Sequence, residues 1–329
     1  MKTKNEISLE QIYKPIDNLM ADVQPTIINI LATSNELTRE VIKYFFSNRG
    51  KLLRPALCFL GSQFGTSNRD TVLKTAASLE VFHSATLVHD DIIDSSYVRR
   101  NAPTVNAKWS PQVAVLVGDY LYDKAFATIF SSKKQDLISL FLSTAGTVCD
   151  GEILELKEKD NFSLKEEQYL EIIEKKTASL LSTCIQSGGL LSDLPMEQIV
   201  ALKNFGLYFG MAFQIIDDCL DFTGTQEELG KVIGLDANEG VLTLPIIRLI
   251  SLVSENKKSE VFKIFKSSLN QDKLSDLLHL ITEYGTVDYA LEKARDYTDN
   301  ARLELSLFPD SEAKRSLELL LDYVLERSR

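Results

Sequence analysis

The sequence predicts an all-α protein of ten or more helices, arranged as a single domain over residues 1–329. Three observations indicate this fold class. Glycine and proline, which interrupt helices, are sparse, with 15 and 8 residues in the chain. Apolar residues recur at helical spacing along most of the sequence, and the alternation typical of strands is weak. No Pro-, Gly- or Ser-rich linker separates two halves.

The predicted helices can be taken in chain order. Residues 71–93 lack Gly and Pro and carry apolar residues at helical spacing, and residues 111–130, 134–158, 165–191 and 197–222 are similar. Residues 311–327 place their leucines on one face, as an amphipathic helix does. Two segments are predicted loops: residues 95–110, with the sole tryptophan, and residues 223–240, with four glycines.

Composition excludes several classes of function. The net charge of −11 makes general nucleic-acid binding a poor hypothesis, because such binding rests on Lys and Arg. The four cysteines are far apart and show no CxxC spacing, so we expect buried thiols in a reducing cytosol. The N-terminus has no apolar signal core, and no run of about 18 apolar residues predicts a membrane span. A cytoplasmic protein is expected.

Two aspartate clusters of the form D-D-x-x-D carry the chemistry. "DDIID" at 90–94 recurs as "DDCLD" at 217–221, and each ends a strongly apolar predicted helix. The first and last aspartates of a cluster share one helix face, and the second lies about 100° round the helix. The six residues are Asp90, Asp91, Asp94, Asp217, Asp218 and Asp221.

Carboxylates in this pattern suit Mg²⁺, which takes one or two of them together with substrate phosphates. Two clusters facing each other across a cavity would hold several Mg²⁺ ions with a diphosphate between them. The alternative for one cluster is a solvated acidic helix end, and the repetition argues against it. The spacing excludes an EF-hand loop.

Basic residues near these clusters complete the pattern. Each one alone is typical of a solvated surface cation, but together they indicate two diphosphate sites. One diphosphate would be bound through metal ions, and the other would be held directly by Arg and Lys. The residues are Lys51 and Arg54 in "RGKLLRP", Arg99 and Arg100 after the first cluster, Lys176 with Thr177 in "KKTASL", and Lys231 in "GKVIG".

The chain resembles the trans-isoprenyl diphosphate synthases, also called polyprenyl synthetases, of the long-chain octaprenyl or solanesyl type. The resemblance covers nearly the whole chain. It rests on "GKLLRP", "FHSATLVHDDIIDSSYVRRNAPTVN", "GDYLYDKAF", "DGEILEL", "KTASL", "FGMAFQIIDDCLDFTG" and "GKVIGLDANEGVLTLPII" in this order, and it ends in the segment from "GTVDYALEKAR" to "LLLDYVLERSR" at residues 285–329. It implies a helical bundle around a deep central cavity, a homodimer, and head-to-tail condensation of isopentenyl diphosphate onto an allylic diphosphate.

The resemblance also implies roles for individual residues. Asp90, Asp94 and Asp217 match direct ligands of two or three Mg²⁺ ions, with Asp91, Asp218 and Asp221 as near partners. The allylic diphosphate would be held by Arg99, Lys176, Thr177, Gln214 and Lys231. Isopentenyl diphosphate would be held by Lys51, Arg54, His83 and Arg100.

The expected catalytic set is Asp90, Asp94, Asp217, Lys176 and Arg99. Metal ions and cations would stabilise the charge of the leaving diphosphate. No side chain is an obvious base, and the resemblance gives that role to the departing diphosphate.

Two positions depart from the family pattern. Leu52 stands where the family usually has a basic residue, and Val241 stands where it usually has lysine. These departures leave room for a slower enzyme, or for a subunit that works only with a partner. Both aspartate clusters are intact, which favours a catalytic chain.

Product length is predicted from the helix before Asp90, along which the growing chain should run. Ala85 and Thr86, one turn before the aspartates, are small, whereas short-product members often have an aromatic residue there. The resemblance therefore implies a long chain of roughly thirty to fifty carbons. Phe82, about 12 Å from Asp90, and Phe141 are candidates for the floor of the cavity, where the growing chain would stop. The alternative for both is ordinary core packing.

Other readings stay open. A terpene cyclase also uses an aspartate-rich helix and Mg²⁺, but its second metal motif is of an Asn/Ser/Glu type and it needs no second diphosphate site. A non-enzymatic helical scaffold has no reason to bind diphosphate and Mg²⁺. The "HD" pair at 89–90 could indicate a metal phosphohydrolase. That chemistry needs further histidines at metal-ligand spacing, and the chain has only three histidines. We expect a quinone side chain as the product's use and peripheral membrane contact for its release.

Overall fold

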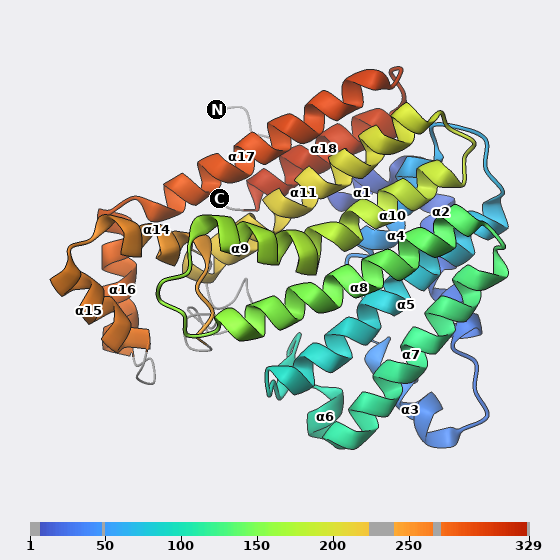
Figure 1. Cartoon of the computed structure of the whole chain (residues 1–329). Coiled ribbons are helices and arrows are strands. Elements are labelled where there is room, and N and C mark those ends of the chain that lie inside the picture. Colours follow the sequence, from blue (N-terminus) through green and yellow to red (C-terminus); the bar gives the residue numbers. More distant parts are fainter. Residues whose placement is uncertain (1–6, 48–49, 224–239, 266–270, 328–329) are drawn as a thin grey trace.

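The computed structural model describes residues 7–47, 50–223, 240–265 and 271–327. Regular structure in these ranges is helical apart from one two-stranded ribbon (Figure 1). The helices of the first half are α1 (Leu9–Tyr13), α2 (Asp17–Ile30), α3 (Glu36–Phe45), α4 (Leu53–Ser62), α5 (Arg69–Ile93), α6 (Val105–Lys108), α7 (Pro111–Ser131) and α8 (Gln135–Glu158). Those of the second half are α9 (Glu166–Ile173), α10 (Ser179–Leu190), α11 (Met196–Thr223), α14 (Leu244–Leu252), α15 (Glu255–Phe265), α16 (Gln271–Glu283), α17 (Thr286–Glu304) and α18 (Glu312–Glu326).

The all-α prediction is confirmed, and local sequence explains where the long helices begin. Asn68 caps α5 by accepting a hydrogen bond from the backbone N–H of Thr71, and Ser110 caps α7 in the same way, followed by Pro111 in the first turn. Ser311 caps α18. These caps satisfy backbone N–H groups that have no partner inside the helix.

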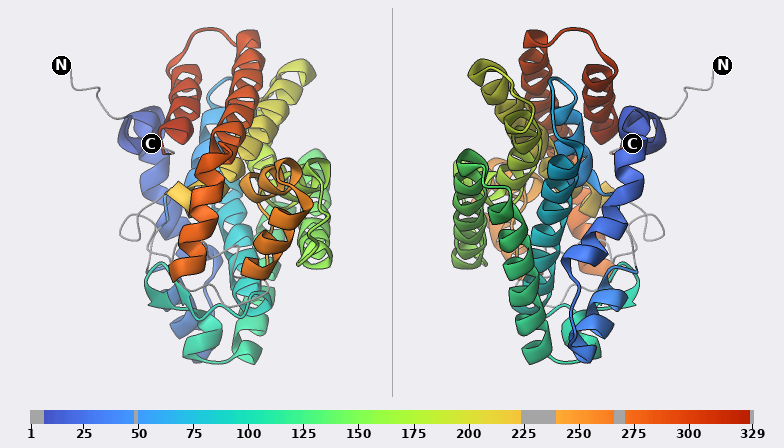
Figure 2. Two further views of the ribbon diagram at one scale, coloured as in Figure 1. Left: turned by 90° about the vertical axis from the view of Figure 1, so that its left-hand side faces the viewer. Right: turned by 90° about the vertical axis from the view of Figure 1, so that its right-hand side faces the viewer.

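The long helices lie side by side, and α14, α15 and α16 gather at one end (Figure 1). Figure 2 shows the same helices from the left-hand and right-hand sides of Figure 1, and the long helices again run side by side. Helix α5 packs against α2, α4 and α7, while α10 packs against α4, α8 and α11. The buried apolar residues form one cluster that extends from Ile12 to Val324. This packing brings the C-terminal ends of α5 and α11, which carry the aspartates, to one cavity.

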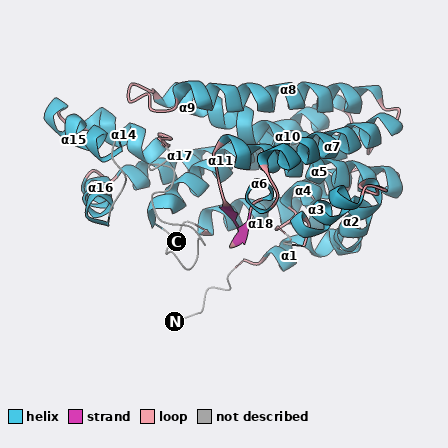
Figure 3. Ribbon diagram, turned by 90° about the horizontal axis from the view of Figure 1, so that it is seen from below, coloured by secondary structure: helices cyan, strands magenta, loops and turns pink. Residues whose placement is uncertain are grey.

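The segment 95–110 is more ordered than predicted. Strands β1 (Val98–Arg99) and β2 (Ala102–Pro103) pair antiparallel, and α6 follows them (Figure 3). Arg100 and Asn101 make the turn with positive φ angles of 50° and 60°. The prediction of a plain loop here is wrong because the turn lets two short extended segments exchange backbone hydrogen bonds.

Two smaller expectations need correction. Cys58, Cys184 and Cys219 are buried free thiols as expected, but Cys149 is exposed on α8. Among the described residues, α8 and α11 are long and apolar enough to cross a membrane, by length and composition only. Most of the apolar window of α11 is buried in the protein, as in the core helix of a soluble protein, while only a third of that of α8 is buried.

Candidate active site

A polar cavity of about 410 Å³ opens between the ends of α5, α8 and α11. Most of the predicted site residues line it together. They are Arg54, His83, Thr86, Asp90, Asp94, Arg99, Arg100, Lys176, Thr177, Gln214 and Asp217. Glu152 and the apolar Leu87, Val148, Leu180 and Phe213 complete its wall. The cavity thus combines acidic groups, basic groups and an apolar side.

The first aspartate cluster ends α5. Asp90 and Asp94 face the cavity, and Asp94 is the C-terminal cap of the helix. Burial, together with the nearby carboxylates of Glu152 and Asp94, raises the pKa of Asp90 to about 7. Near neutral pH the Asp90 carboxyl therefore keeps part of its proton until a cation replaces it.

Asp91 points the other way and anchors the β1–β2 ribbon. Its Oδ1 accepts a hydrogen bond from Arg99 Nε at 2.8 Å, and its backbone oxygen accepts from the Ser96 N–H at 2.9 Å. The Asp91 side chain is buried, and burial raises the pKa of its carboxyl although Arg99 opposes the shift. Asp91 therefore fixes the position of Arg99 and does not itself line the cavity.

In the second cluster, only Asp217 lines the cavity. Asp218 accepts hydrogen bonds from Tyr169 Oη at 2.6 Å and Gln214 Nε2 at 2.8 Å. Gln214 Oε1 in turn accepts from Thr177 Oγ1 at 2.8 Å. Asp221, predicted to share the face of Asp217, is buried and does not line this cavity. The hydrogen-bonded chain through Asp218 fixes two residues predicted to hold the allylic diphosphate.

Lys176 and Thr177 lie in a π-helical turn, residues Glu174–Ala178, between α9 and α10. Such turns are frequent at functional sites because they redirect side chains. Lys176 Nζ is 2.9 Å from Glu152 Oε2 and also pairs with Glu155 on α8. Burial alone would lower the pKa of Lys176, but Glu155 and Glu152 raise it, so the ammonium stays charged.

Helix α8 approaches this turn closely at Gly151. A β-carbon at this position would lie 2.5 Å from the backbone nitrogen of Lys176, which real side chains essentially never tolerate. The glycine in "DGEILEL" is therefore required by the contact that places Glu152 and Glu155 beside Lys176. The two glutamates belong to a segment that the sequence singled out without giving them a role.

A group of cations lies beside His83. The Nε of Arg54 is buried without a hydrogen-bond partner among the described residues, and the same holds for Oε2 of Glu80. Burial and the nearby arginines hold the pKa of His83 well below its ordinary value, so its ring is neutral. A donor such as Arg54 Nε, buried at a cavity wall and lacking an acceptor, suits an anionic ligand.

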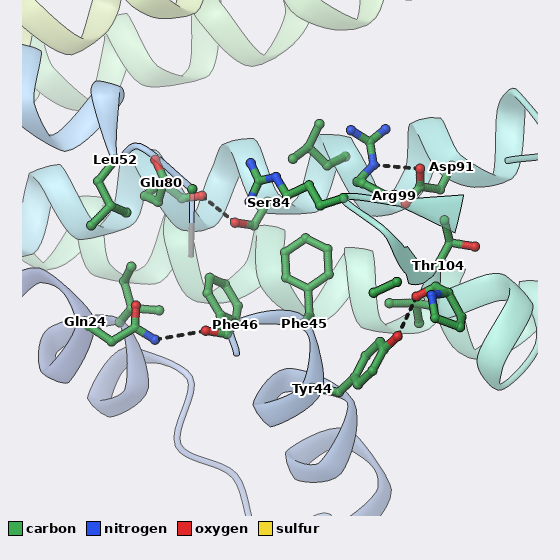
Figure 4. Close-up of a pocket in the computed structure, with 17 residues that line it drawn as sticks. Gln24, Tyr44, Phe45, Phe46, Leu52, Glu80, Ser84, Asp91, Arg99 and Thr104 are labelled. Carbon is green, nitrogen blue, oxygen red and sulfur yellow. Dashed lines mark hydrogen bonds and ion pairs between the residues drawn. The ribbon is translucent and has the colours of Figure 1, made fainter. Parts of the chain in front are cut away.

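Figure 4 shows a smaller pocket behind this wall, which shares Leu87, Arg99 and Arg100 with the cavity. Leu52 and Asp91 belong to it, on opposite sides of the view. Leu52 thus lines this smaller pocket and does not line the main cavity. Val241 lines a separate pocket beside Asp94, Lys176 and Thr177, where a lysine would have been close to them.

One predicted basic residue, Lys51, does not line the cavity. Lys51 stacks its ammonium over the ring of Tyr323, with Nζ 5.6 Å from the centroid, and its backbone oxygen accepts from Tyr13 Oη. Lys231 falls outside the described residues. Residue types and spacing predicted that aspartates and basic residues would lie together, and the family resemblance supplied the individual assignments. Neither predicted the positions of Lys51, Asp91, Asp218 and Asp221.

The predicted length-determining residues lie on α5 and α8, and one of them lines the cavity. Thr86 lines it, while Ala85, Phe82 and Phe141 are buried. The rings of Phe82 and Phe141 are 5.1 Å apart, and Tyr122 and Phe126 of α7 join them to make an aromatic cluster. The prediction that Phe82 and Phe141 act as a floor stays a prediction, and their proximity is consistent with it.

The fit to a divalent metal follows from the donors. Among the described residues, no three acidic, histidine or cysteine side chains come close enough to hold an ion by themselves. Mg²⁺ takes one or two carboxylates together with substrate phosphates. Asp90, Asp94 and Asp217 can supply these carboxylates from two sides of the cavity. His89 is turned toward α7, with Nε2 3.2 Å from the oxygen of Val115, and is not part of the cavity.

Comparison with known proteins decides the family. The family model described as "Polyprenyl synthetase" matches residues 35–281, three quarters of the chain. The chain belongs to the polyprenyl synthetase family. It is 33% identical to the all-trans-nonaprenyl-diphosphate synthase (geranyl-diphosphate specific) of Rhodobacter capsulatus, over 97% of this chain and 98% of that one. It is 31% identical to the short chain isoprenyl diphosphate synthase of Methanothermobacter thermautotrophicus, over 84% and 86%.

A solved polyprenyl synthase has the same fold. The polyprenyl synthase of Caulobacter crescentus CB15, complexed with calcium and isoprenyl diphosphate, superposes with a TM-score of 0.93 at 29% identity and covers 99% of both chains. These relatives are prenyl diphosphate synthases, and the chain is accordingly a prenyltransferase. Their names differ in product length, from short chain to nonaprenyl, so family membership alone leaves the product open.

Proposed function

We propose that this polyprenyl synthetase is a long-chain all-trans polyprenyl diphosphate synthase that condenses isopentenyl diphosphate onto an allylic diphosphate such as farnesyl diphosphate. The observation that carries the proposal is the shared cavity, in which the carboxylates of both aspartate clusters face Arg54, Arg99, Arg100 and Lys176. This charge pattern provides for two diphosphates. A terpene cyclase would leave Arg54 and Arg100 without use.

The reaction breaks the bond between C1 of the allylic chain and its diphosphate oxygen, which leaves with the electron pair. The isopentenyl double bond then attacks C1, and the resulting cation loses a proton to the departing diphosphate. Bound Mg²⁺, of which we expect two or three ions, would neutralise the diphosphate charge as it develops. Asp90, Asp94 and Asp217 would hold that metal.

The chain's own residues supply the remaining parts. Lys176, kept charged by Glu152 and Glu155, and Arg99, fixed by Asp91, would hold the allylic diphosphate. Arg54, Arg100 and neutral His83 would hold isopentenyl diphosphate at the other side of the cavity. The apolar Leu87, Val148 and Leu180 would keep water from the allylic cation.

We further propose a homodimer formed through α7 and α8. Leu142, Cys149, Ile153 and Leu156 are exposed along one stripe of α8, and Leu116 is exposed on α7. An apolar helix face of this kind is usually covered by a partner, and a second copy fits because the surface is the same on both chains. Location in the cytoplasm, supply of a quinone side chain and peripheral membrane contact during release remain predictions.

Incubation of the protein with Mg²⁺, farnesyl diphosphate and labelled isopentenyl diphosphate tests the activity. We expect a ladder that ends in one long species. A product that stops at fifteen or twenty carbons keeps the chemistry and overturns the long-chain reading of Ala85 and Thr86. No incorporation would contradict the activity of the chain by itself.

The same assay tests the aspartates. Asp90→Ala and Asp217→Ala should each abolish turnover, with losses of at least about a hundredfold, because a metal ligand is removed from each side of the cavity. Asp299→Ala, at an exposed position of α17 that does not line the cavity, is a matched control that should leave the rate unchanged. Near-normal turnover in either cavity variant would refute the arrangement.

A further inference from the structure

The C-terminal helix reaches the second aspartate cluster. Arg327, the residue that caps α18, places Nη2 2.8 Å from Oδ1 of Asp217. Its guanidinium also stacks over the ring of Phe213, with 5.1 Å between the guanidinium carbon and the centroid. Phe213 and Asp217 are one turn apart on α11, so Arg327 docks on the helix face that carries the predicted metal ligand.

The same end of α18 touches the predicted isopentenyl side. Tyr323, one turn before Arg327, lies under the ammonium of Lys51. A small apolar pocket joins Tyr323, Phe213 and Arg327 to Tyr13 and Lys51. One helix end therefore contacts both an aspartate of the metal site and a lysine assigned to the second diphosphate site.

A guanidinium at Asp217 has a clear electrostatic effect. Asp217 lines a cavity that also contains the carboxylates of Asp90, Asp94 and Glu152. A planar, weakly hydrated guanidinium is well suited to neutralise a partly buried carboxylate. A divalent ion at the same carboxylate would repel the guanidinium and compete for its oxygen.

We propose that Arg327 is an internal counter-ion of Asp217 that gives way when metal and diphosphate bind. The proposal rests on the proposed function, because it takes Asp217 to be a metal ligand. It assigns to Arg327 a positioning role that no motif in the sequence indicated. Its consequence is that metal entry loosens the last turn of α18, which also contacts Lys51 through Tyr323.

Metal affinity tests this directly, without turnover. Binding of Mn²⁺, used as a paramagnetic probe, is measured by electron paramagnetic resonance in wild type, Arg327→Gln and Arg302→Gln, each with and without inorganic diphosphate. Arg302 is the matched control, because it forms an equivalent ion pair with Asp322 at 2.7 Å on the outer side of α18. Arg327→Gln should bind Mn²⁺ at least about fivefold more tightly, and Arg302→Gln should match wild type.

Hydrogen exchange gives a second readout. Amides of the last turn of α18 should exchange faster in wild type once Mn²⁺ and diphosphate are added, and should be fast from the start in Arg327→Gln. Unchanged Mn²⁺ affinity in Arg327→Gln would show a merely structural ion pair, and weaker affinity would show that Arg327 orients Asp217 for the metal. Either result overturns the proposal.

The two claims can fail separately. If wild type binds no Mn²⁺ even with diphosphate, the proposed function fails and the counter-ion role falls with it. If wild type binds Mn²⁺ and Arg327→Gln binds no more tightly, only the counter-ion role is overturned.

Discussion

At the scale of single residues, Asp90 carries the strongest conflict between charge and burial. Its carboxyl lies beside Glu152 and Asp94, and its pKa is raised to about 7. Lys176 opposes this shift but does not cancel it. A carboxyl of this kind binds metal only by giving up a proton, which links metal binding to pH.

This gives a prediction for pH dependence. Below pH 7 the proton on Asp90 competes with Mg²⁺, so the Mg²⁺ concentration for half-maximal rate should fall as pH rises from 6 to 8. In the metal-free protein, a rise in pH should instead be unfavourable, because it lowers the free energy of unfolding. The folded state holds this proton more tightly than the unfolded chain, so stability should fall as pH rises from about 4 to 7.

Mg²⁺ titrations of the rate at several pH values, with thermal unfolding of the metal-free protein, measure both effects. Asp90→Asn should reduce the pH dependence of unfolding in this range, and the part that remains comes from other carboxyls with raised pKa, such as Asp91 and Glu152. A Mg²⁺ requirement independent of pH between 6 and 8 would contradict the assignment.

Residue types and spacing predicted much of this site but not its internal pairings. The D-D-x-x-D pattern correctly indicated that Asp90, Asp94 and Asp217 line one cavity. It could not show that Asp218 is held by Tyr169, or that Arg327 pairs with Asp217, because these contacts join segments far apart in the chain. Glu152 and Glu155 were visible only as an E-x-x-E spacing, which solvated helices also show.

At the scale of elements, the π-helical turn and α8 form one unit. Gly151 lets α8 lie against the backbone of Lys176, and this contact places Glu152 beside the lysine. This arrangement depends on one close approach, that of Gly151 on α8 to the backbone of Lys176. A small displacement of this turn would move both Lys176 and Thr177.

Gly151→Ala should therefore impair activity without unfolding the protein. The new methyl group must displace the turn, and a shift of about 1 Å in a positioning group can cost on the order of a hundredfold in rate. Ser143→Ala is the control on the same helix, because it removes an exposed hydroxyl and adds no atom against the turn. Rates and melting temperatures are compared, and equal rates for the two variants would contradict the account.

The aromatic cluster of Phe82, Tyr122, Phe126 and Phe141 joins α5, α7 and α8. Phe82→Ala or Phe141→Ala should lengthen the product, because removal of a ring opens the path beneath Thr86. Each change should also cost about 3–5 kcal/mol of stability. Phe205→Ala, equally buried on α11 and outside the cluster, is the control for that loss. Chain lengths are read by chromatography of the products, and an unchanged ladder for both cluster variants would contradict the proposal.

Ala85→Phe should shorten the product, because an aromatic ring would then stand one turn before the aspartates.

At the scale of the whole molecule, the apolar stripe of α8 supports the proposed dimer. Ile153→Glu would bury an unpaired carboxylate in the dimer and should weaken association by roughly a hundredfold. Leu303→Glu, on an exposed position of α17, is the control. Sedimentation of wild type and both variants measures this, and a monomeric wild type would rule out the proposed dimer.

The sequence predicted the helical class well and the arrangement of helices only through the family resemblance. Sparse glycine and proline and helical periodicity are local properties, and they located α5, α7, α8, α11 and α18 within a few residues. The β1–β2 ribbon was missed because its two-residue strands are too short for any periodicity. Which helices meet depends on close contacts such as Gly151 against Lys176, which no periodicity reveals.

The central claim is that the two aspartate clusters hold divalent metal around one diphosphate. A crystal structure with Mn²⁺ and a non-reactive allylic diphosphate analogue, with anomalous scattering to locate the metal, tests it most directly. We predict Mn²⁺ peaks that bridge the diphosphate to Asp90 and Asp94 on one side and to Asp217 on the other. A diphosphate bound in the cavity with no metal at these aspartates would contradict the account.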